Sequence, residues 1–260
     1  MTQTIDKTLA RRPEDWKFAP QPLEGKKIVL SGGTTGIGRA ILLMLTAEGA
    51  DVLTFARGKT ELDEALAAAD GAAGKAYGLT ADQSRPDDLK AVFARVDRDL
   101  GGLDILINCA AVAGGSVTDS GFEETQSVLH TNIDGYVQCC RLALERMKDN
   151  QGHIVNIGSM SAHVRESGSD IYAATKAAVM AFSDSLRKTL NKKGIRVSLI
   201  EPGSVGSDMQ PTSPQEEAQR QKRGEMLVAD DIAEAVHYCL TQPSRCEIMT
   251  LQIKPTRQII

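Results

Sequence analysis

A tyrosine, a lysine and a serine in the second half of the chain have the types and spacing that proton transfer requires. Tyr172 and Lys176 are four residues apart, so in a helix their side chains share one face. A lysine ammonium beside a phenol stabilises the phenolate, which predicts a Tyr172 pKa below its usual value of about 10. Ser159, thirteen residues before the tyrosine, could hydrogen-bond the same substrate oxygen. Together the three predict acid–base chemistry at an alcohol or a carbonyl.

A glycine-rich turn near the start of the chain is suited to binding phosphate. It follows the apolar run KKIVL and precedes the helical pattern RAILLML. Glycines permit a tight turn and let backbone N–H groups approach a pyrophosphate, and the helix N-terminus adds a favourable partial charge. The spacing is G-x-x-x-G-x-G, not the commoner G-x-G-x-x-G, and a tight turn without a ligand is the alternative. The residues of this turn are Ser31, Gly32, Gly33, Thr34, Thr35, Gly36, Ile37 and Gly38.

The end of the second predicted strand bears on the choice of nucleotide. It reads Phe55-Ala56-Arg57-Gly58, and the next acid is Glu61. In dinucleotide-binding α/β folds this position meets the adenosine ribose, where a carboxylate would bind the hydroxyls and repel a 2′-phosphate. A guanidinium instead suits a phosphate. Arg57 therefore predicts NADP(H) over NAD(H), and an ordinary surface cation is the alternative.

Short apolar runs alternate with longer helical patterns along the chain. The predicted strands are Lys27–Leu30, Val52–Ala56, Ala76–Leu79, Ile105–Asn108, Ile154–Ile157, Val197–Ile200 and Ile248–Ile253. The predicted helices lie near 37–48, 60–69, 86–99, 122–148, 171–191 and 230–241. Brief strands rich in Val, Ile and Leu are typical of parallel strands buried on both faces. The alternation predicts an α/β protein with a single-domain Rossmann fold, a doubly wound seven-stranded parallel sheet with helices on both faces.

Two segments stand outside this alternation. Residues 1–24 carry three prolines and mixed charges and are interpreted as an N-terminal arm, followed by one domain over 25–260. The segment 204–228 is polar, has two prolines and no aromatic residue, and follows a strand end, where open α/β sheets bind their ligands. It is interpreted as a flexible substrate flap, and a solvated helix with its loop is the alternative.

Composition narrows the classes of protein. The chain has 260 residues, of which 42% are hydrophobic and 25% charged, and its net charge is −4. These ordinary globular values give no sign of a nucleic-acid or anionic-membrane surface. Five cysteines without a C-x-x-C pair or a His/Cys ligand cluster predict reduced thiols, a cytoplasmic location and no metal. No apolar run approaches the length of a membrane span, and the N-terminus lacks the apolar region of a signal peptide.

With these motifs in this order, the chain resembles the short-chain dehydrogenase/reductase family over about residues 25–258. SGGTTGIG resembles the family's T-G-x-x-x-G-I-G turn, with Ser31 in place of threonine. NCAA at 108–111 stands where the family has N-N-A-G. Asp82 in ADQS, Asn132 in HTNIDGY and the segment EPGSV at 201–205 match further motifs, as do the serine, tyrosine and lysine above.

The resemblance implies a catalytic set of Asn132, Ser159, Tyr172 and Lys176. Tyr172 would be the acid/base, Lys176 would lower its pKa and hold the nicotinamide ribose, Ser159 would polarise the substrate oxygen, and Asn132 would hold a water that links Lys176 to solvent. Together with Arg57, the implied cofactor-binding residues are Ser31, Gly32, Thr34, Thr35, Gly36, Ile37, Gly38, Asp82, Asn108, Ala110, Tyr172, Lys176, Pro202, Gly203, Val205 and Ser207.

The resemblance also bears on substrate and partners. It implies hydride transfer between nicotinamide and a carbonyl or alcohol carbon. The segment 204–228 has no aromatic residue and few bulky apolar residues, which favours a small carbonyl, secondary alcohol or hydroxy acid. The C-terminal tail is similar to that of 3-hydroxy-acid and serine dehydrogenases, which hints at the same substrates. It implies a homotetramer or homodimer formed through the helices near 122–148 and 171–191. The NCAA departure predicts weaker cofactor affinity at most, and His163 and Arg165 could touch the substrate. A catalytically weak NADP-binding sensor or scaffold on the same fold is the alternative function.

Overall fold

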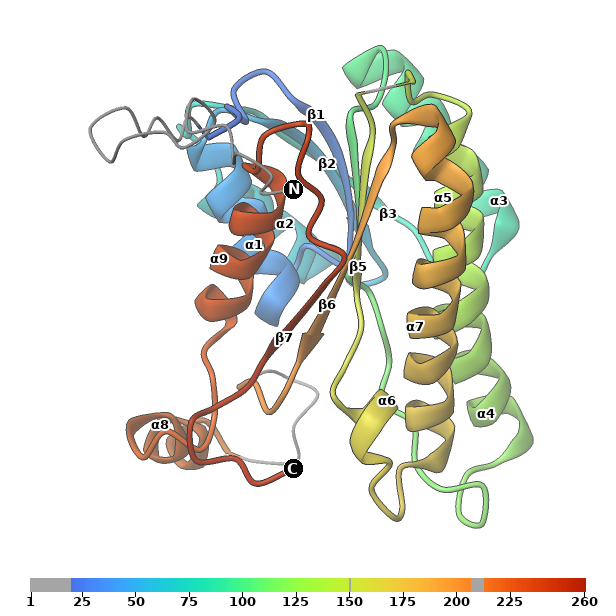
Figure 1. Ribbon diagram of the computed structural model, residues 1–260, viewed down its shortest axis with the longest axis vertical. Coiled ribbons are helices and arrows are strands. Elements are labelled where there is room, and N and C mark those ends of the chain that lie inside the picture. The colour runs from blue at the N-terminus through green and yellow to red at the C-terminus, as the bar shows by residue number, and fades with distance from the viewer. Residues whose placement is uncertain (1–19, 150, 207–212) are drawn as a thin grey trace, which may run out of the picture.

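A seven-stranded, fully parallel sheet forms the centre of the protein in a computed structural model, which describes residues 20–149, 151–206 and 213–260 (Figure 1). The strand order is β3-β2-β1-β4-β5-β6-β7. The strands are β1 (Lys27–Ser31), β2 (Asp51–Ala56), β3 (Ala76–Thr80), β4 (Ile105–Asn108), β5 (His153–Ile157), β6 (Arg196–Pro202) and β7 (Thr250–Ile253). The order reverses between β1 and β4, which is the point where such sheets bind ligands. The predicted doubly wound sheet is confirmed.

Helices cover both faces of this sheet (Figure 1). The helices are α1 (Gly36–Ala47), α2 (Lys59–Ala68), α3 (Pro86–Arg95), α4 (Phe122–Leu129), α5 (Gly135–Leu144), α6 (Ser161–Val164), α7 (Asp170–Leu190), α8 (Pro214–Lys222) and α9 (Ala229–Leu240). On one face Ile28 and Leu30 of β1 pack in a core with α1, α2 and α9, and on the other Val29 packs in a core with α3, α5 and α7. Alternate residues of one strand thus serve two cores, which explains the uninterrupted apolar runs.

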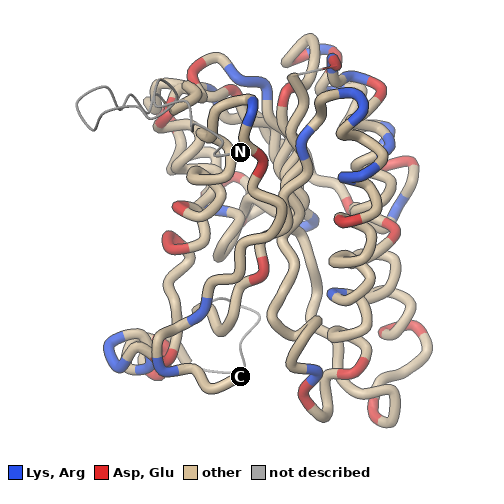
Figure 2. Tube along the Cα trace, viewed as in Figure 1, with Lys and Arg blue, Asp and Glu red and all other residues tan. Residues whose placement is uncertain are grey.

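Charged residues gather on the outer surfaces of the helices and loops, while the central strands carry few (Figure 2). Both signs are interspersed, as expected for a chain of net charge −4. In the described part of the chain, no helix has the length and apolar composition needed to cross a membrane.

The helix predicted near 122–148 is divided into three parts. A π-helical turn, His130–Asp134, separates α4 from α5, and α5 ends at Leu144. Asn132, inside this turn, makes side-chain hydrogen bonds to Val112 and Thr175, and periodicity alone could not reveal such long-range contacts. A second π-helical turn, Val96–Leu100, continues α3, where the sequence predicted helix to 99. The short helices α6 and α8 were not predicted.

Most of the predicted N-terminal arm lies outside the described residues. Its described end, from Pro20, rests on the domain, because the Gln21 backbone N–H donates to the Thr241 carbonyl at 2.8 Å and the Leu23 side chain is buried. The predicted flap at 204–228 contains α8, which begins with a capping box formed by Ser213 and Glu216. Part of this segment is therefore regular helix.

Buried cysteines predict a loss of stability in alkali. Burial raises the pKa of Cys140 to about 12 and of Cys239 to about 11, and it holds the pKa of Cys139 well above its ordinary value of 9.0. Above pH 9 these thiols ionise in the unfolded chain while the folded chain keeps them protonated. The free energy of unfolding should therefore fall by about 1.4 kcal/mol per pH unit for each thiol.

Urea unfolding between pH 8 and pH 10.5 measures this slope. Cys140→Ala should make the fall in the free energy of unfolding with pH shallower by the contribution of one thiol, about 1.4 kcal/mol per pH unit. Equal slopes for the wild type and Cys140→Ala would contradict the assignment.

Candidate active site

A cleft of about 810 Å³ lies at the carboxyl end of the sheet. Its walls come from the glycine turn after β1, the loops after β2, β3 and β4, the loop between Ser159 and Tyr172, α7, and the turn after β6. Figure 1 shows α6 and α8 on opposite sides of this end of the sheet. The cleft thus unites sequence motifs that lie more than a hundred residues apart.

Ser159, Tyr172 and Lys176 all line this cleft. Lys176 is 2% exposed, and its ammonium donates to the Ile157 carbonyl at 3.0 Å. The same ammonium lies 5.6 Å from the centre of the Tyr172 ring and 5.4 Å from that of Tyr136. An ammonium has three N–H donors, so Lys176 can still donate hydrogen bonds to a ligand in the cleft.

The pKa of Tyr172 differs from the sequence-based prediction. Burial raises it to about 12, and a hydrogen bond with Ser159 acts in the opposite direction without overcoming burial. Burial also lowers the pKa of Lys176 to about 8. The prediction of a Tyr172 pKa below its usual value was wrong for the protein alone, because it weighed the neighbouring charge and not the desolvation of the phenol. At neutral pH the phenol is therefore protonated and suited to donate a proton.

Asn132 lies in the π-helical turn and is fully buried. Its amide nitrogen donates to the Val112 carbonyl at 2.9 Å, and its amide oxygen accepts from the Val112 backbone N–H at 2.9 Å. The amide nitrogen also donates to the Thr175 hydroxyl at 3.2 Å. The side chain therefore fixes the loop after β4 and the helix that carries Tyr172 and Lys176. π-Helical turns are frequent at functional sites.

The glycine turn forms the cleft wall below the N-terminus of α1. Gly32, Thr34, Thr35, Gly36, Ile37 and Gly38 all line the cleft. Gly32 and Gly36 have φ angles of 74° and 47°, which disfavour other residues. A Cβ atom at Gly32 would lie 2.8 Å from the Ala110 Cα, and one at Gly38 would overlap the Gly32 carbonyl. Thr35 makes no side-chain cap, so the first N–H groups of α1 are left for a ligand.

The far end of the cleft contains the groups expected near an adenosine. Arg57 and Glu61, both exposed, line it together with Asp82. One Asp82 oxygen already accepts from the Ser84 N–H at 2.9 Å and from its hydroxyl at 2.7 Å. Glu61 is four residues beyond Arg57 in the sequence, and the structure places its carboxylate beside Gly58, the residue that follows Arg57.

Two predicted cofactor-binding residues do not line the cleft. The Ser31 hydroxyl accepts from the Cys109 and Ala110 backbone N–H groups at 3.0 and 3.1 Å, so it joins the ends of β1 and β4. The fully buried Asn108 amide donates to the Asn156 side chain at 2.9 Å. Both residues support the sheet beneath the cleft, while Ala110 and Ala111 reach its surface.

The turn after β6 completes the wall opposite the glycines. Pro202, Gly203 and Val205 line the cleft as predicted, and Ser207 lies outside the described residues. Arg220 of α8 and Gln258 near the C-terminus also line it. Arg220 belongs to the predicted flap but was not singled out there, and no motif connects Gln258 to the earlier segments.

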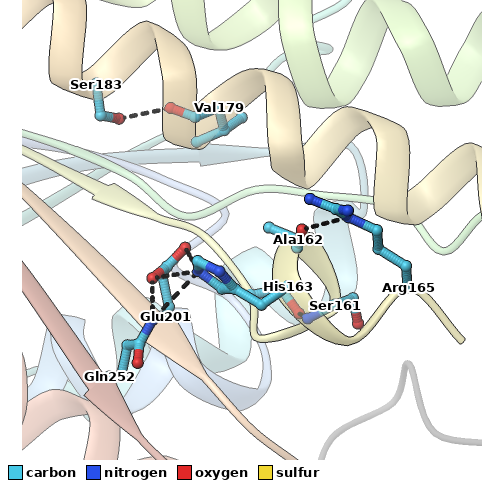
Figure 3. Close-up of polar contacts among 9 residues, drawn as sticks. Ser161, Ala162, His163, Arg165, Val179, Ser183, Glu201 and Gln252 are labelled. Atoms are coloured by element: carbon cyan, nitrogen blue, oxygen red, sulfur yellow. Dashed lines mark hydrogen bonds and ion pairs between the residues drawn. The ribbon is translucent and has the colours of Figure 1, made fainter.

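Neither His163 nor Arg165, both expected as possible substrate contacts, lines the cleft. Arg165 donates from Nε to the Ala162 carbonyl at 3.2 Å, and the next residue, Glu166, does line the cleft. His163 points toward Glu201, as Figure 3 shows. Among the described residues, no cluster of three potential metal ligands is present.

A doubly wound parallel sheet with a glycine turn at its switch point, and with serine, tyrosine and lysine at the same edge, defines a Rossmann-type α/β protein. A family model described as short chain dehydrogenase matches residues 26–218. The chain belongs to the short-chain dehydrogenase/reductase family and is an oxidoreductase.

Individual relatives agree with this assignment. The chain is 34% identical over 235 residues to an uncharacterized oxidoreductase of Staphylococcus aureus, covering 90% of this chain and 98% of the relative. It is 36% identical over 242 residues to farnesol dehydrogenase of Aedes aegypti, covering 89% and 96%. A short chain dehydrogenase from Burkholderia cenocepacia, solved in complex with NADP, superposes with a TM-score of 0.82 at 29% identity, covering 90% and 98%.

Proposed function

We propose that this protein is an NADP(H)-dependent reductase or dehydrogenase that acts on a small carbonyl compound, its secondary alcohol or a hydroxy acid. The observation that carries the proposal is the convergence of Ser159, Tyr172 and Lys176 on one cleft with the glycine turn. A proton-handling phenol and a phosphate-binding turn are needed together only where a nucleotide cofactor and a substrate meet.

The chain's own groups suit such a cofactor. The uncapped N-terminus of α1 and the close backbone approach at Gly32 and Gly38 provide a place for a pyrophosphate. Lys176 keeps donors for ribose hydroxyls, and Arg57 offers a guanidinium to a 2′-phosphate. The Burkholderia relative was solved with NADP, which supports the same choice here. The bound nicotinamide would supply or accept the hydride.

Proton transfer is assigned to Tyr172. Because burial keeps its phenol protonated at neutral pH, it is ready to give a proton to the oxygen of a carbonyl substrate during reduction. Ser159 hydrogen-bonds the phenol and can polarise the same substrate oxygen. Lys176 provides a neighbouring positive charge that favours the phenolate left after transfer. Asn132 holds the loop after β4 and α7 in register, and we assign it the proton path from Lys176 to solvent.

Purified protein should oxidise NADPH in the presence of at least one carbonyl compound from a panel of aldehydes, ketones and keto acids. The panel should also contain an isoprenoid aldehyde, because one relative is named for farnesol. A protein that binds NADPH, measured by fluorescence titration, but oxidises it with no member of the panel would support the sensor or scaffold alternative.

The remaining assignments complete this proposal. Helices α5 and α7 form a subunit contact in a homotetramer or homodimer, supported by the apolar hollow between them that Val137, Leu144, Phe182 and Leu186 line. The segment 204–228 acts as a flap over the site, supported by Arg220 of α8 in the cleft wall. The enzyme works in the cytoplasm with reduced cysteines. Size-exclusion chromatography with light scattering tests the oligomer.

A further inference from the structure

A histidine, a buried glutamate and a glutamine form a polar cluster beside the cleft (Figure 3). The His163 Nε2 atom of α6 lies 2.9 and 3.0 Å from the two carboxylate oxygens of Glu201 on β6. The Gln252 amide nitrogen of β7 donates to the same carboxylate at 3.0 Å. The Glu201 side chain is 1% exposed, whereas that of His163 is 39% exposed. The cluster therefore joins α6 to the last two strands of the sheet.

The chemistry of the cluster fixes its donors. An ionised carboxylate only accepts hydrogen bonds, so the proton of His163 must be on Nε2. The Gln252 amide nitrogen lies 3.2 Å from that Nε2 atom, and both nitrogens donate to the Glu201 carboxylate. A buried carboxylate is tolerated only where such donors face it. Loss of His163 would leave Glu201 with too few partners, so the link between α6 and β6 would open.

Both ends of this link adjoin the cleft wall. Glu201 directly precedes Pro202 and Gly203, which line the cleft, and His163 is flanked on α6 by the lining residues Ser161 and Val164. Backbone bonds tie the start of this loop to β6, from Gly158 N–H to the Ile200 carbonyl at 2.7 Å and from Met160 N–H to the Pro202 carbonyl at 2.9 Å. Beyond Met160, the hydrogen bonds between α6 and β6 among the described residues are those of His163.

Helix α6 depends on tertiary contacts for its position, and these include its packing on α7. It has four residues, too few for a helix that is stable without tertiary contacts. It ends at Arg165, whose φ of 56° is a left-handed value that a non-glycine residue rarely adopts. The residues that follow, 165–168, are exposed. The His163–Glu201 contact is therefore well placed to fix where Ser161 and Val164 meet the substrate.

We propose that His163 is a positioning residue for substrate, which acts through Glu201 and Gln252 by holding α6 as the substrate-side wall of the cleft. This inference rests on the proposed oxidoreductase function for its kinetic consequence only. His163 neither touches the reacting atoms nor carries a proton in the reaction. Its replacement should therefore weaken the use of the carbonyl substrate more than the binding of NADPH or the chemical step.

The test compares His163→Ala and His163→Gln with His237→Ala. His237 is the matched control, because its Nε2 lies 4.0 Å from Glu48 in a pair whose side chains are 31% and 52% exposed, away from the cleft. His163→Ala should raise the KM for the carbonyl substrate about 10-fold while kcat and the Kd for NADPH change by less than about threefold. Amide hydrogens of residues 159–165 should exchange about 10-fold faster or more.

His163→Gln should restore most of the wild-type KM, because a glutamine amide can donate to Glu201 in the place of Nε2. His237→Ala should leave KM and exchange unchanged. An unchanged KM and exchange rate in His163→Ala would overturn the proposal, as would a His163→Gln variant no better than His163→Ala. If His163→Ala fails to fold, Glu201→Met, which removes the acceptor for Nε2, should speed the exchange of residues 159–165 in the same way, and unchanged exchange would overturn the proposal. If the wild type oxidised no NADPH, the proposed function would be refuted. Hydrogen exchange would still test whether the His163–Glu201 contact holds α6 in place.

Discussion

Replacing Tyr172 with phenylalanine should reduce turnover more than about 100-fold while NADPH binding stays near that of the wild type. The change removes one oxygen from a side chain that lines the cleft beside Lys176 and Ser159. The phenol is the group placed to protonate the substrate oxygen, and its removal leaves the ring packing intact. Single-turnover NADPH oxidation measures the chemical step, and fluorescence titration measures cofactor binding.

Tyr136 provides a matched control for this variant. Its ring lies 5.4 Å from the same lysine ammonium, but its hydroxyl donates to the Ile157 carbonyl at 3.1 Å and it does not line the cleft. Tyr136→Phe should therefore keep turnover within about threefold of the wild type, apart from a modest loss of stability. If Tyr172→Phe kept its turnover, or if both variants lost it equally, the acid/base role of Tyr172 would be refuted.

Replacing Arg57 with aspartate should reverse the cofactor preference. Arg57 is exposed, lines the cleft near Asp82, and makes no side-chain hydrogen bond or ion pair with the described residues. A carboxylate there would repel a 2′-phosphate and accept from ribose hydroxyls. The ratio of kcat/KM for NADPH to that for NADH should fall about 100-fold or more, which corresponds to about 2.7 kcal/mol.

Two further variants make this result specific. Arg98→Asp changes the same charge at a similarly exposed position outside the cleft and should leave the ratio unchanged. Glu61→Gln tests the alternative of an NAD(H) preference, in which the Glu61 carboxylate binds the ribose hydroxyls. A fall in NADH use with Glu61→Gln, combined with no effect of Arg57→Asp on NADPH use, would show that the preference for NADP(H) is wrong.

Local patterns in the sequence were sufficient to predict the sheet, the glycine turn, and the set of serine, tyrosine and lysine. The central strands β1, β4 and β5 are buried on both faces, so their apolar runs are continuous and stand out from the helical patterns around them. The turn is recognisable because Gly32 and Gly36 are needed for their backbone angles alone. Helix spacing likewise places Tyr172 and Lys176 on one face regardless of the rest of the fold.

The tertiary structure decided features that the spacing of residues along the chain does not predict. Burial set the direction of the Tyr172 pKa, because desolvation depends on every segment that covers the phenol. The side-chain bonds of Asn132 to Val112 and Thr175 accompany the π-helical turn that divides a helix predicted to be continuous. Ser31 and Asn108 support the sheet because their partners come from neighbouring strands. The sequence therefore determined which groups could act, whereas long-range contacts decided which of them face the cleft and with what charge.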